Sequence, residues 1–400
     1  MKKGYNILLL ILIMVGCKKP YNPLVISTDN SFLVVEGLIN TGQDSTSIKL
    51  SRTVKLSSTN TVKPELNAVV TVESDQNNNY ALPEAGNGIY SSPPLNLSLA
   101  AKYRLRIKTT DGKEYLSDYV EAKITPGIDS LSFHVENNGV QFYVAAHDPQ
   151  NKTRYYRWDF SETYKYIAAA QSSLKLGPNG LPVYRTAYID SLDNIYQCYK
   201  TIPSHQVLLN STAKLGQDIV TKQPIDFVAG ESGKVSHGYG LLVRQYALTV
   251  EGFNYWQILK KNTEQLGSIF DAQPSSLQGN IHCTTNPDEP VIGFVSASDF
   301  KLKRLYVDPT ELFGVSFPNY IPPPPVTDCE SKFIPIAPEG SFQERLKLTV
   351  GSGDSVLLEP VQPIGAPAII GYSYVQKECA DCRAKAPFGT NVKPAFFPSY

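Results

Sequence analysis

The pattern of apolar and polar positions that best fits a helix lies within the stretch Leu241–Val307. A strand-like run, Leu241–Val250, leads into a segment whose large side chains recur mostly at helical spacing. Those side chains are Phe253, Tyr255, Trp256, Ile258, Leu259 and Leu266. Thr249 is placed to cap the start of this helix, and Gly267 stands where a left-handed residue ends one. The pattern predicts a helix near residues 251–266, and we expect its tryptophan to be a core anchor and not a ligand contact.

Outside this stretch the apolar positions mostly alternate with polar ones, which is typical of β-strands. Residues 32–125 contain about seven short runs of this kind, separated by turn residues. The clearest hairpin turns at Asp111-Gly112, two residue types that accept a positive φ. The alternating apolar positions before that turn are Tyr103, Leu105 and Ile107. This region therefore predicts an N-terminal immunoglobulin-like or transthyretin-like sandwich.

Pro126-Gly127 marks the predicted boundary to a larger β-rich domain, residues 126–400, which contains the helix. Alternating residues on both sides of Asn138-Gly139 predict a hairpin at the start of this domain. Apolar residues at Leu346–Val350 and Ser355–Leu358 predict two further strands near its end. The chain is thus expected to be mainly β, with one amphipathic helix in the second domain.

An aromatic-dense segment, residues 155–166, lies early in the second domain. Its alternation directs Tyr156, Trp158 and Phe160 to one side of a strand. Two interpretations fit this pattern: a platform on which a ligand stacks, or a packed sheet face, which is the commoner arrangement. The residues of the candidate binding surface are Tyr155, Tyr156, Trp158, Tyr164 and Tyr166.

The first 16 residues have the pattern of an export signal. Two lysines precede the apolar run Ile7–Val15, and a glycine stands directly before Cys17. This order resembles a bacterial lipobox, so Cys17 is predicted to be lipidated and to anchor the chain to a membrane through a tether, residues 17–31. The run is too short for a spanning helix, which needs about 20 apolar residues. An ordinary secretory signal followed by a chance cysteine is the alternative.

Composition narrows the class of protein. Lysine plus arginine and aspartate plus glutamate both number 37, so the formal net charge is zero. Nucleic-acid binding needs a basic face, and this balance argues against it. The 24 tyrosines, 29 prolines and 27 glycines beside 2 methionines fit an exported, turn-rich β protein. A chain of 400 residues is expected to form two or three domains.

Five cysteines remain after Cys17, and in an exported protein they predict disulfides before metal ligands. We expect at least one disulfide among Cys283, Cys329, Cys379 and Cys382. The last two form a CxxC, for which a redox or zinc role is the alternative. A zinc ribbon needs a second CxxC, which the sequence lacks.

Sequence motifs for catalysis are missing. No GxSxG, HExxH, P-loop or Rossmann pattern occurs. His282-Cys283, near Asp288 and Glu289, is the one local group that resembles a metal site, but a turn and a disulfide explain it better. Asp148–Asn151 lacks the spacing of a calcium-binding EF-hand and is better read as a turn. We therefore expect no catalytic residue, no metal, no cofactor and no enzymatic activity. A surface hydrolase acting on glycan or peptide, or an adhesin or envelope scaffold, is the alternative.

Several segments together resemble the DUF4249 family of Bacteroidetes outer-membrane lipoproteins. After the lipobox cysteine these are FLVVEGLIN, YYRWDFSETYKY, VRQYALTVEGFNYWQIL, GSIFDAQPSSLQGNI and CADCRAKAPFGTNVKPAFF. The resemblance implies an accessory role beside a TonB-dependent transporter in nutrient uptake, and it brings no established catalytic residues. We expect the transporter contact in the second domain, which also holds the proline run 322–325. Lys18-Lys19 after the anchor leaves open which face of the outer membrane the protein occupies.

Overall fold

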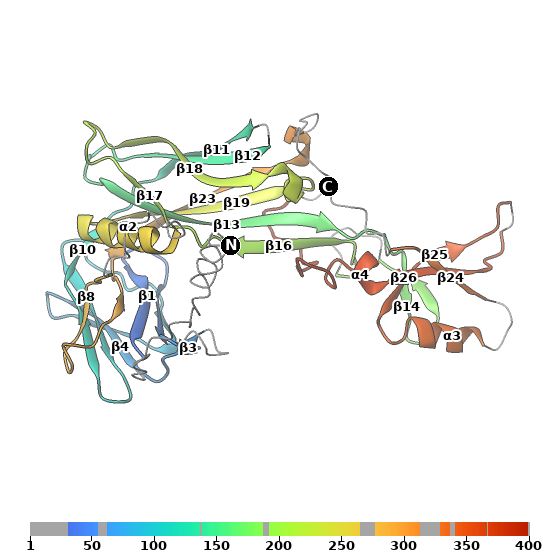
Figure 1. Cartoon of the computed structure of the whole chain (residues 1–400), viewed down its shortest axis with the longest axis horizontal. Coiled ribbons are helices and arrows are strands. Elements are labelled where there is room, and N and C mark those ends of the chain that lie inside the picture. Colours follow the sequence, from blue (N-terminus) through green and yellow to red (C-terminus); the bar gives the residue numbers. More distant parts are fainter. Residues whose placement is uncertain are drawn as a thin grey trace, which may run out of the picture.

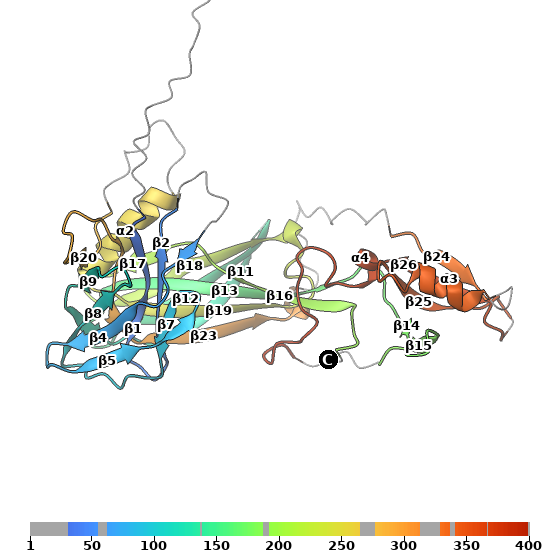
Figure 2. The ribbon, with the colours of Figure 1, turned by 90° about the horizontal axis from the view of Figure 1, so that it is seen from below.

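Strands dominate the molecule and gather into three units, as Figures 1 and 2 show. The structure is a computed structural model that describes residues 31–54, 62–136, 138–186, 192–264, 277–312, 329–336, 341–365 and 367–398. The first two units lie against each other at one end of an elongated molecule, and the third unit lies at the other end (Figure 1). The predicted mainly β architecture is confirmed.

The first unit comprises residues 31–125 and 277–299 and contains a 13-stranded sheet. Its strands from the start of the chain are β1 (Leu33–Asn40), β2 (Thr46–Arg52), β3 (Lys63–Pro64), β4 (Val69–Ser74), β5 (Asn79–Leu82), β6 (Glu84–Gly86), β7 (Ile89–Ser92), β8 (Lys102–Lys108), β9 (Glu114–Ser117) and β10 (Val120–Lys123). The predicted hairpin is confirmed, because β8 pairs with β9 across the turn that holds Gly112. Tyr103, Leu105 and Ile107 of β8 are buried, as their alternation predicted.

Three short strands from much later in the chain complete this sheet. They are β20 (Ile281–Cys283), β21 (Ile292–Gly293) and β22 (Ala297–Ser298). β20 pairs with β9, and β22 runs parallel to both β1 and β10. Gly279 and Gly293 allow the chain to fold back on itself, because a Cβ at Gly279 would lie 1.7 Å from the carbonyl oxygen of Gly293. The predicted domain 126–400 is therefore not one body, since residues 281–298 belong to the first sheet.

A buried ion network fixes this returning segment. The hydroxyl of Tyr115 donates to a Glu289 carboxylate oxygen at 2.7 Å, and the Lys113 ammonium donates to the other oxygen at 2.6 Å. Arg52 donates to the Tyr115 hydroxyl at 3.3 Å and to Glu65 at 2.5 Å, and it lies 3.5 Å from the Glu289 carboxylate. Burial raises the pKa of Glu289, but the hydrogen bonds from Lys113 and Tyr115 and the nearby positive charges outweigh it and hold that pKa below its ordinary value.

The second unit comprises residues 126–167, 197–264 and 300–312, and its core lies between two sheets. One sheet is β11 (Ile128–Glu136), β12 (Gly139–His147) and β18 (Ile219–Ala229). The other is β13 (Tyr155–Ile167), β16 (Gln197–Pro203), β17 (Leu208–Ser211), β19 (Tyr239–Ala247) and β23 (Phe300–Val307). Short 3-10 turns, η1 (Gly230–Ser232) and η2 (Pro309–Leu312), follow β18 and β23. The predicted hairpin at Asn138-Gly139 is confirmed by the pairing of β11 with β12.

Helix α2 (Val250–Glu264) lies where the first two units meet (Figure 1). The Thr249 hydroxyl accepts a hydrogen bond from the Gly252 amide at 3.2 Å, so the predicted N-cap is confirmed. Leu266 and Gly267 lie outside the described residues. The stretch Leu241–Val307 thus connects the first two units. It supplies β19 and β23 to the second unit and β20–β22 to the sheet of the first unit. Between them it supplies α2, which lies at the junction.

The third unit comprises residues 168–186, 192–196 and the described part of 329–382. Its elements are β14 (Leu174–Leu176), β15 (Pro182–Tyr184), β24 (Lys332–Pro335), β25 (Ser355–Val361), β26 (Gly371–Gln376), α3 (Phe342–Thr349) and α4 (Lys377–Ala380). The predicted strand Ser355–Leu358 is confirmed as part of β25. The predicted strand Leu346–Val350 is wrong, because most of it belongs to α3, whose Leu346 packs beneath β24 and β25 residues in a small core. None of the described helices is both long enough and apolar enough to cross a membrane.

Candidate functional site

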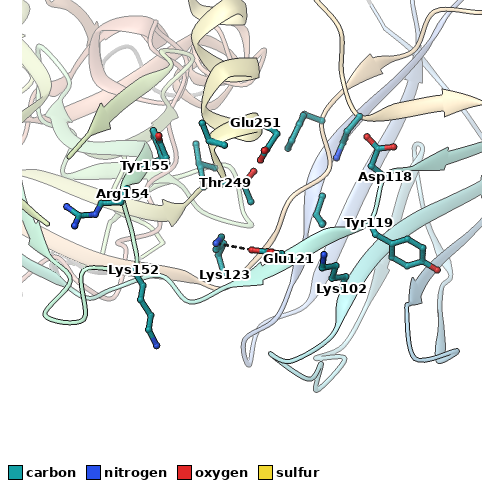
Figure 3. Close-up of a pocket in the computed structure, with 15 residues that line it drawn as sticks. Lys102, Asp118, Tyr119, Glu121, Lys123, Lys152, Arg154, Tyr155, Thr249 and Glu251 are labelled. Atoms are coloured by element: carbon teal, nitrogen blue, oxygen red, sulfur yellow. Dashed lines mark hydrogen bonds and ion pairs between the residues drawn. The ribbon is translucent and has the colours of Figure 1, made fainter. Parts of the chain in front are cut away.

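A cleft of about 590 Å³ lies between the first and second units, at the start of α2 (Figure 3). The strand β10 and the residues before it form one wall. The loop that leads into β13 and the first turn of α2 form the other. Ligand sites occur preferentially at domain interfaces of this kind. The lining residues labelled in Figure 3 are Lys102, Asp118, Tyr119, Glu121, Lys123, Lys152, Arg154, Tyr155, Thr249 and Glu251.

Contacts of α2 fix the shape of this cleft. The ring of Tyr155 packs against Phe253 with 5.0 Å between centroids, and the Leu248 amide donates to the Tyr155 carbonyl at 2.9 Å. On the other side Tyr255 packs against Phe294 of the first unit at 5.3 Å. Gly252 permits this approach, because a Cβ there would lie 3.2 Å from the Phe294 ring. The helix therefore contacts both units.

Hydrogen bonds hold the two walls together where the chain passes between the first and second units. The hydroxyl of Thr125 donates to the Asp299 carbonyl at 2.6 Å, and the Thr125 amide donates to the Asp299 carboxylate at 2.6 Å. The same hydroxyl accepts from the Ala247 amide at 3.1 Å. The Gln245 side chain donates to the Pro126 carbonyl and accepts from the Trp158 indole, both at 2.8 Å. The linker between the units, which includes Thr125 and Pro126, is thus hydrogen-bonded to residues of the second unit.

Charges of both signs line the cleft. Lys123 pairs with Glu121 at 3.2 Å (Figure 3). Arg154 donates to the Thr212 and Leu215 carbonyls. The Thr249 hydroxyl caps the helix. The described lining contains no histidine, cysteine or serine, so it holds no nucleophile beside a base of those types. Such a surface suits recognition of a polar or zwitterionic partner.

The metal-like group around His282 is not assembled. His282 is exposed and lies 3.5 Å from Asp118, whereas Cys283 is buried and Glu289 belongs to the ion network. Asp148 accepts hydrogen bonds from three backbone amides of the loop that follows it, which makes it a turn residue. Among the described residues, no three His, Cys, Asp or Glu side chains are placed to hold a metal ion.

The candidate aromatic surface is mostly core. Tyr156 and Trp158 are 0% exposed, and Tyr164 is also buried, because this side of β13 faces the sheet formed by β11, β12 and β18. Burial first, and second the hydrogen bond that its hydroxyl donates to Asp218, raise the pKa of Tyr156. Tyr155 and Tyr166 are half-buried. The platform interpretation is therefore wrong for Tyr156, Trp158 and Tyr164, and Tyr155 alone reaches the cleft.

Trp256 is not the core anchor that the helical pattern predicted. It is half-buried and stacks on the Arg157 guanidinium at 4.3 Å. Tyr255 is the buried aromatic residue of α2. Adjacent residues on a helix point about 100° apart, and the tertiary contact with Phe294 decides which of the two is covered.

The cysteines form two disulfides, Cys329–Cys379 and Cys198–Cys382. The prediction of at least one disulfide in the candidate set is confirmed. Each cysteine of the CxxC bonds to a different distant partner, so the motif is structural. The assignment of Cys283 as a disulfide candidate is wrong, because it is buried and free in β20, while Cys198 was missed. Cys17, residues 18–30 of the tether and the proline run lie outside the described residues.

Sequence reasoning also missed the cleft. Lys102, Glu121, Lys123 and Arg154 are scattered charges without a motif. One signal was present: Glu121 and Lys123 stand directly before the predicted boundary at Pro126, and an interdomain junction is a preferred place for ligand sites.

The fold and the cleft define a β protein of several units with a polar junction site. The family model described as "Domain of unknown function (DUF4249)" matches residues 18–304, and the chain belongs to this family. The match covers the first unit and most of the second, whereas the segment 329–398 and its CxxC lie beyond it. No curated protein matches the chain.

Solved structures offer only remote likenesses. The calcium binding domain CBD12 of CALX1.1 is 7% identical, with 69% of this chain and 99% of that chain covered and a TM-score of 0.17. A candidate carbohydrate binding protein from Bacteroides uniformis ATCC 8492 is 10% identical, with 55% of this chain and 91% of that chain covered and a TM-score of 0.15. Neither likeness carries a functional argument.

Proposed function

We propose that this protein is an outer-membrane lipoprotein that serves as a non-enzymatic accessory of a TonB-dependent transporter in nutrient uptake. The export signal and the predicted lipidation at Cys17 support the location. Membership of the DUF4249 family supports the transporter as the partner, through the resemblance described above. A short lipid tether keeps the protein at the membrane surface and raises the effective concentration of membrane partners, to about the millimolar range.

The surface of the third unit carries this proposal. The four most exposed large apolar side chains of the described residues all belong to it, although it is the smallest unit. They are Ile364, Leu348, Leu192 and Tyr184. Apolar surface in water costs about 25 cal/mol per Å², so a partner that covers these side chains gains free energy. We therefore assign the docking surface to the third unit.

Geometry supports the same assignment. The third unit projects from the other two at one end of the molecule, where a large partner is free to approach it (Figures 1 and 2). Cys329–Cys379 links two of its segments, and Cys198–Cys382 links it to β16 of the second unit, so the third unit is held in place before any partner arrives. A preorganised surface loses less entropy on binding.

Affinity recovery from solubilised outer membranes tests the proposal. The full-length tagged protein is cross-linked in cells growing on the natural nutrient, and the recovered transporter is quantified. The test variant combines Leu348→Glu with Ile364→Glu, and the matched control combines Val69→Glu with Ile124→Glu on exposed apolar positions of the first unit. We expect the test variant to reduce recovery at least about tenfold and the control to leave it unchanged.

Two outcomes contradict the proposal. Equal recovery with the test variant and the wild type removes the third unit from the interface. Recovery of no transporter with the wild type puts the hydrolase or adhesin alternatives ahead.

A further inference from the structure

A second groove, of about 410 Å³, lies on the outer face of the sheet that contains β13 and β19. Alternation along β13 sends Trp158 into the core and turns Arg157 and Asp159 outward. Arg244 and Tyr246 of β19 stand opposite Asp159 and Arg157 in the sheet register. Trp256 of α2 and the loop at residues 203–207 form the rest of the wall. The groove is thus built from two strands, a helix and a loop.

The guanidinium of Arg157 contacts two aromatic rings. Its central carbon lies 4.2 Å from the Tyr246 ring centroid and 4.3 Å from that of Trp256. These two cation–π contacts restrict the guanidinium and do not use its N–H groups as hydrogen-bond donors. No described residue accepts a hydrogen bond from the Arg157 side chain, and Asp159, the nearest carboxylate, lies 3.6 Å away.

Arg244 is only partly satisfied. Its Nε is buried and has no hydrogen-bond partner among the described atoms. Its Nη1 donates to the Tyr246 hydroxyl at 3.5 Å and lies 3.6 Å from the other oxygen of Asp159, beyond hydrogen-bond distance. The strong hydrogen bond of Asp159 comes from the Tyr246 hydroxyl at 2.8 Å, and burial first and the Asp159 charge second raise the pKa of Tyr246 to about 12. Among the residues that line the groove, two guanidinium groups therefore face one carboxylate, that of Asp159.

The rim of the groove is fixed and polar. The Val207 amide donates to the Glu264 carboxylate at 2.6 Å, and Lys260 donates to the Val207 carbonyl at 2.7 Å, so α2 holds the loop. Exposed His205 and Gln206 lie on that loop and offer both donors and acceptors. A preformed groove with one net positive charge, an aromatic wall and a polar rim matches a ligand that has a carboxylate and several hydroxyl groups.

We propose that this groove binds a small hydroxylated carboxylate, of the sugar-acid class, whose carboxylate takes up the free N–H groups of Arg157 and Arg244. The planar fork of a guanidinium matches a carboxylate in bidentate geometry. The rim and Asp159 bind the hydroxyl groups, and the Trp256 indole contacts the carbon skeleton. This site is separate from the cleft of Figure 3 and independent of transporter docking.

Calorimetric titration of the full-length protein with glucuronate tests the inference, with glucose and inorganic phosphate as parallel ligands. We expect saturable glucuronate binding that weakens as salt rises, with no response to glucose. Emission of Trp256 is expected to change in parallel, because Trp158, the second of the two tryptophans, is fully buried. Arg244→Gln is expected to weaken glucuronate at least about tenfold, and Arg244→Lys, which keeps the charge and loses the fork, less.

The control variant is Arg104→Gln, which removes an arginine stacked on Tyr119 in the first unit. It is expected to bind glucuronate as the wild type does. Thermal unfolding of each variant separates lost binding from lost folding. The inference is overturned if glucuronate gives no heat, if phosphate binds as tightly as glucuronate, or if Arg244→Gln retains folded structure and full affinity.

Discussion

The first and third units both close a β core with chain segments that are far apart in sequence, and they use different bonds to do so. The first unit has one large apolar cluster, pairs strands β20–β22 with its own, and adds the buried ion network around Glu289. The third unit has two small apolar clusters, one internal disulfide, Cys329–Cys379, and a second disulfide, Cys198–Cys382, that ties it to β16 of the second unit. A small core contributes little stability, so covalent links take the place of burial. The first unit is therefore held mainly by apolar burial, and the third unit mainly by covalent links.

The largest expected effect comes from removing the two disulfides that hold the third unit, one within it and one that links it to β16 of the second unit. Replacing all four bonded cysteines with alanine is expected to destabilise the third unit by about 3–5 kcal/mol, because the links span 184 and 50 residues. Hydrogen exchange measured segment by segment should show lost protection in α3 and β24–β26 and retained protection in β1–β10. Equal loss in both units would contradict the comparison.

A smaller effect is expected from the ion network of the first unit. Glu289→Gln removes the charge that Lys113 and Arg52 face and is expected to destabilise this unit by about 1–3 kcal/mol. Glu289 is 7% exposed, so solvent screens it little. Chemical denaturation followed by first-unit hydrogen exchange measures the change, with Glu36→Gln, at an exposed surface pair, as the control.

The pH dependence of stability checks the same network. Because the folded-state pKa of Glu289 is lowered, its contribution is fully present above the ordinary value of 4.5 and is lost as the pH falls through the lowered value. The wild type should therefore lose first-unit stability on acidification below pH 4.5, and Glu289→Gln should lose less. Identical pH profiles would show that another group controls the acid limb.

The smallest effect is expected at Cys283, the free cysteine of the first unit. Cys283→Ala removes one buried sulfur and its contact with Thr285, and it is expected to cost about 1 kcal/mol. Because Cys283 is free, reducing agent should leave the stability of the first unit of the wild type unchanged. A strong response of β20 to reduction would mean that Cys283 takes part in a disulfide after all.

Local patterns predicted the elements whose signals are local. The β8–β9 and β11–β12 hairpins, the Thr249 cap and the start of α2 follow from alternation, turn residues and helical spacing. Strands of two residues such as β21 are too short to show an alternating pattern. The pairing of residues 281–298 with the first sheet therefore could not be predicted from the sequence. Leu346–Val350 looked like a strand because a short apolar run does not distinguish a strand from a helix.

The sites were harder to predict than the elements. The groove of Arg157 and Arg244 depends on the register between β13 and β19, and the cleft depends on how two units meet. No sequence motif indicates either the register of these strands or the packing of the two units. Tyr255 is more buried than Trp256 because the first unit covers the Tyr255 face of α2. That difference depends on tertiary contacts, which the local sequence does not show.

The central claim, that the third unit is the docking surface for a transporter, is tested most directly by site-specific photo-cross-linking in living cells. A photoreactive amino acid is placed at Leu348 in the third unit or at Val69 in the first unit, two exposed apolar positions. The account predicts a light-dependent adduct with a TonB-dependent transporter from position 348 and none from position 69. An adduct from position 69 alone, or none from either position, would contradict it.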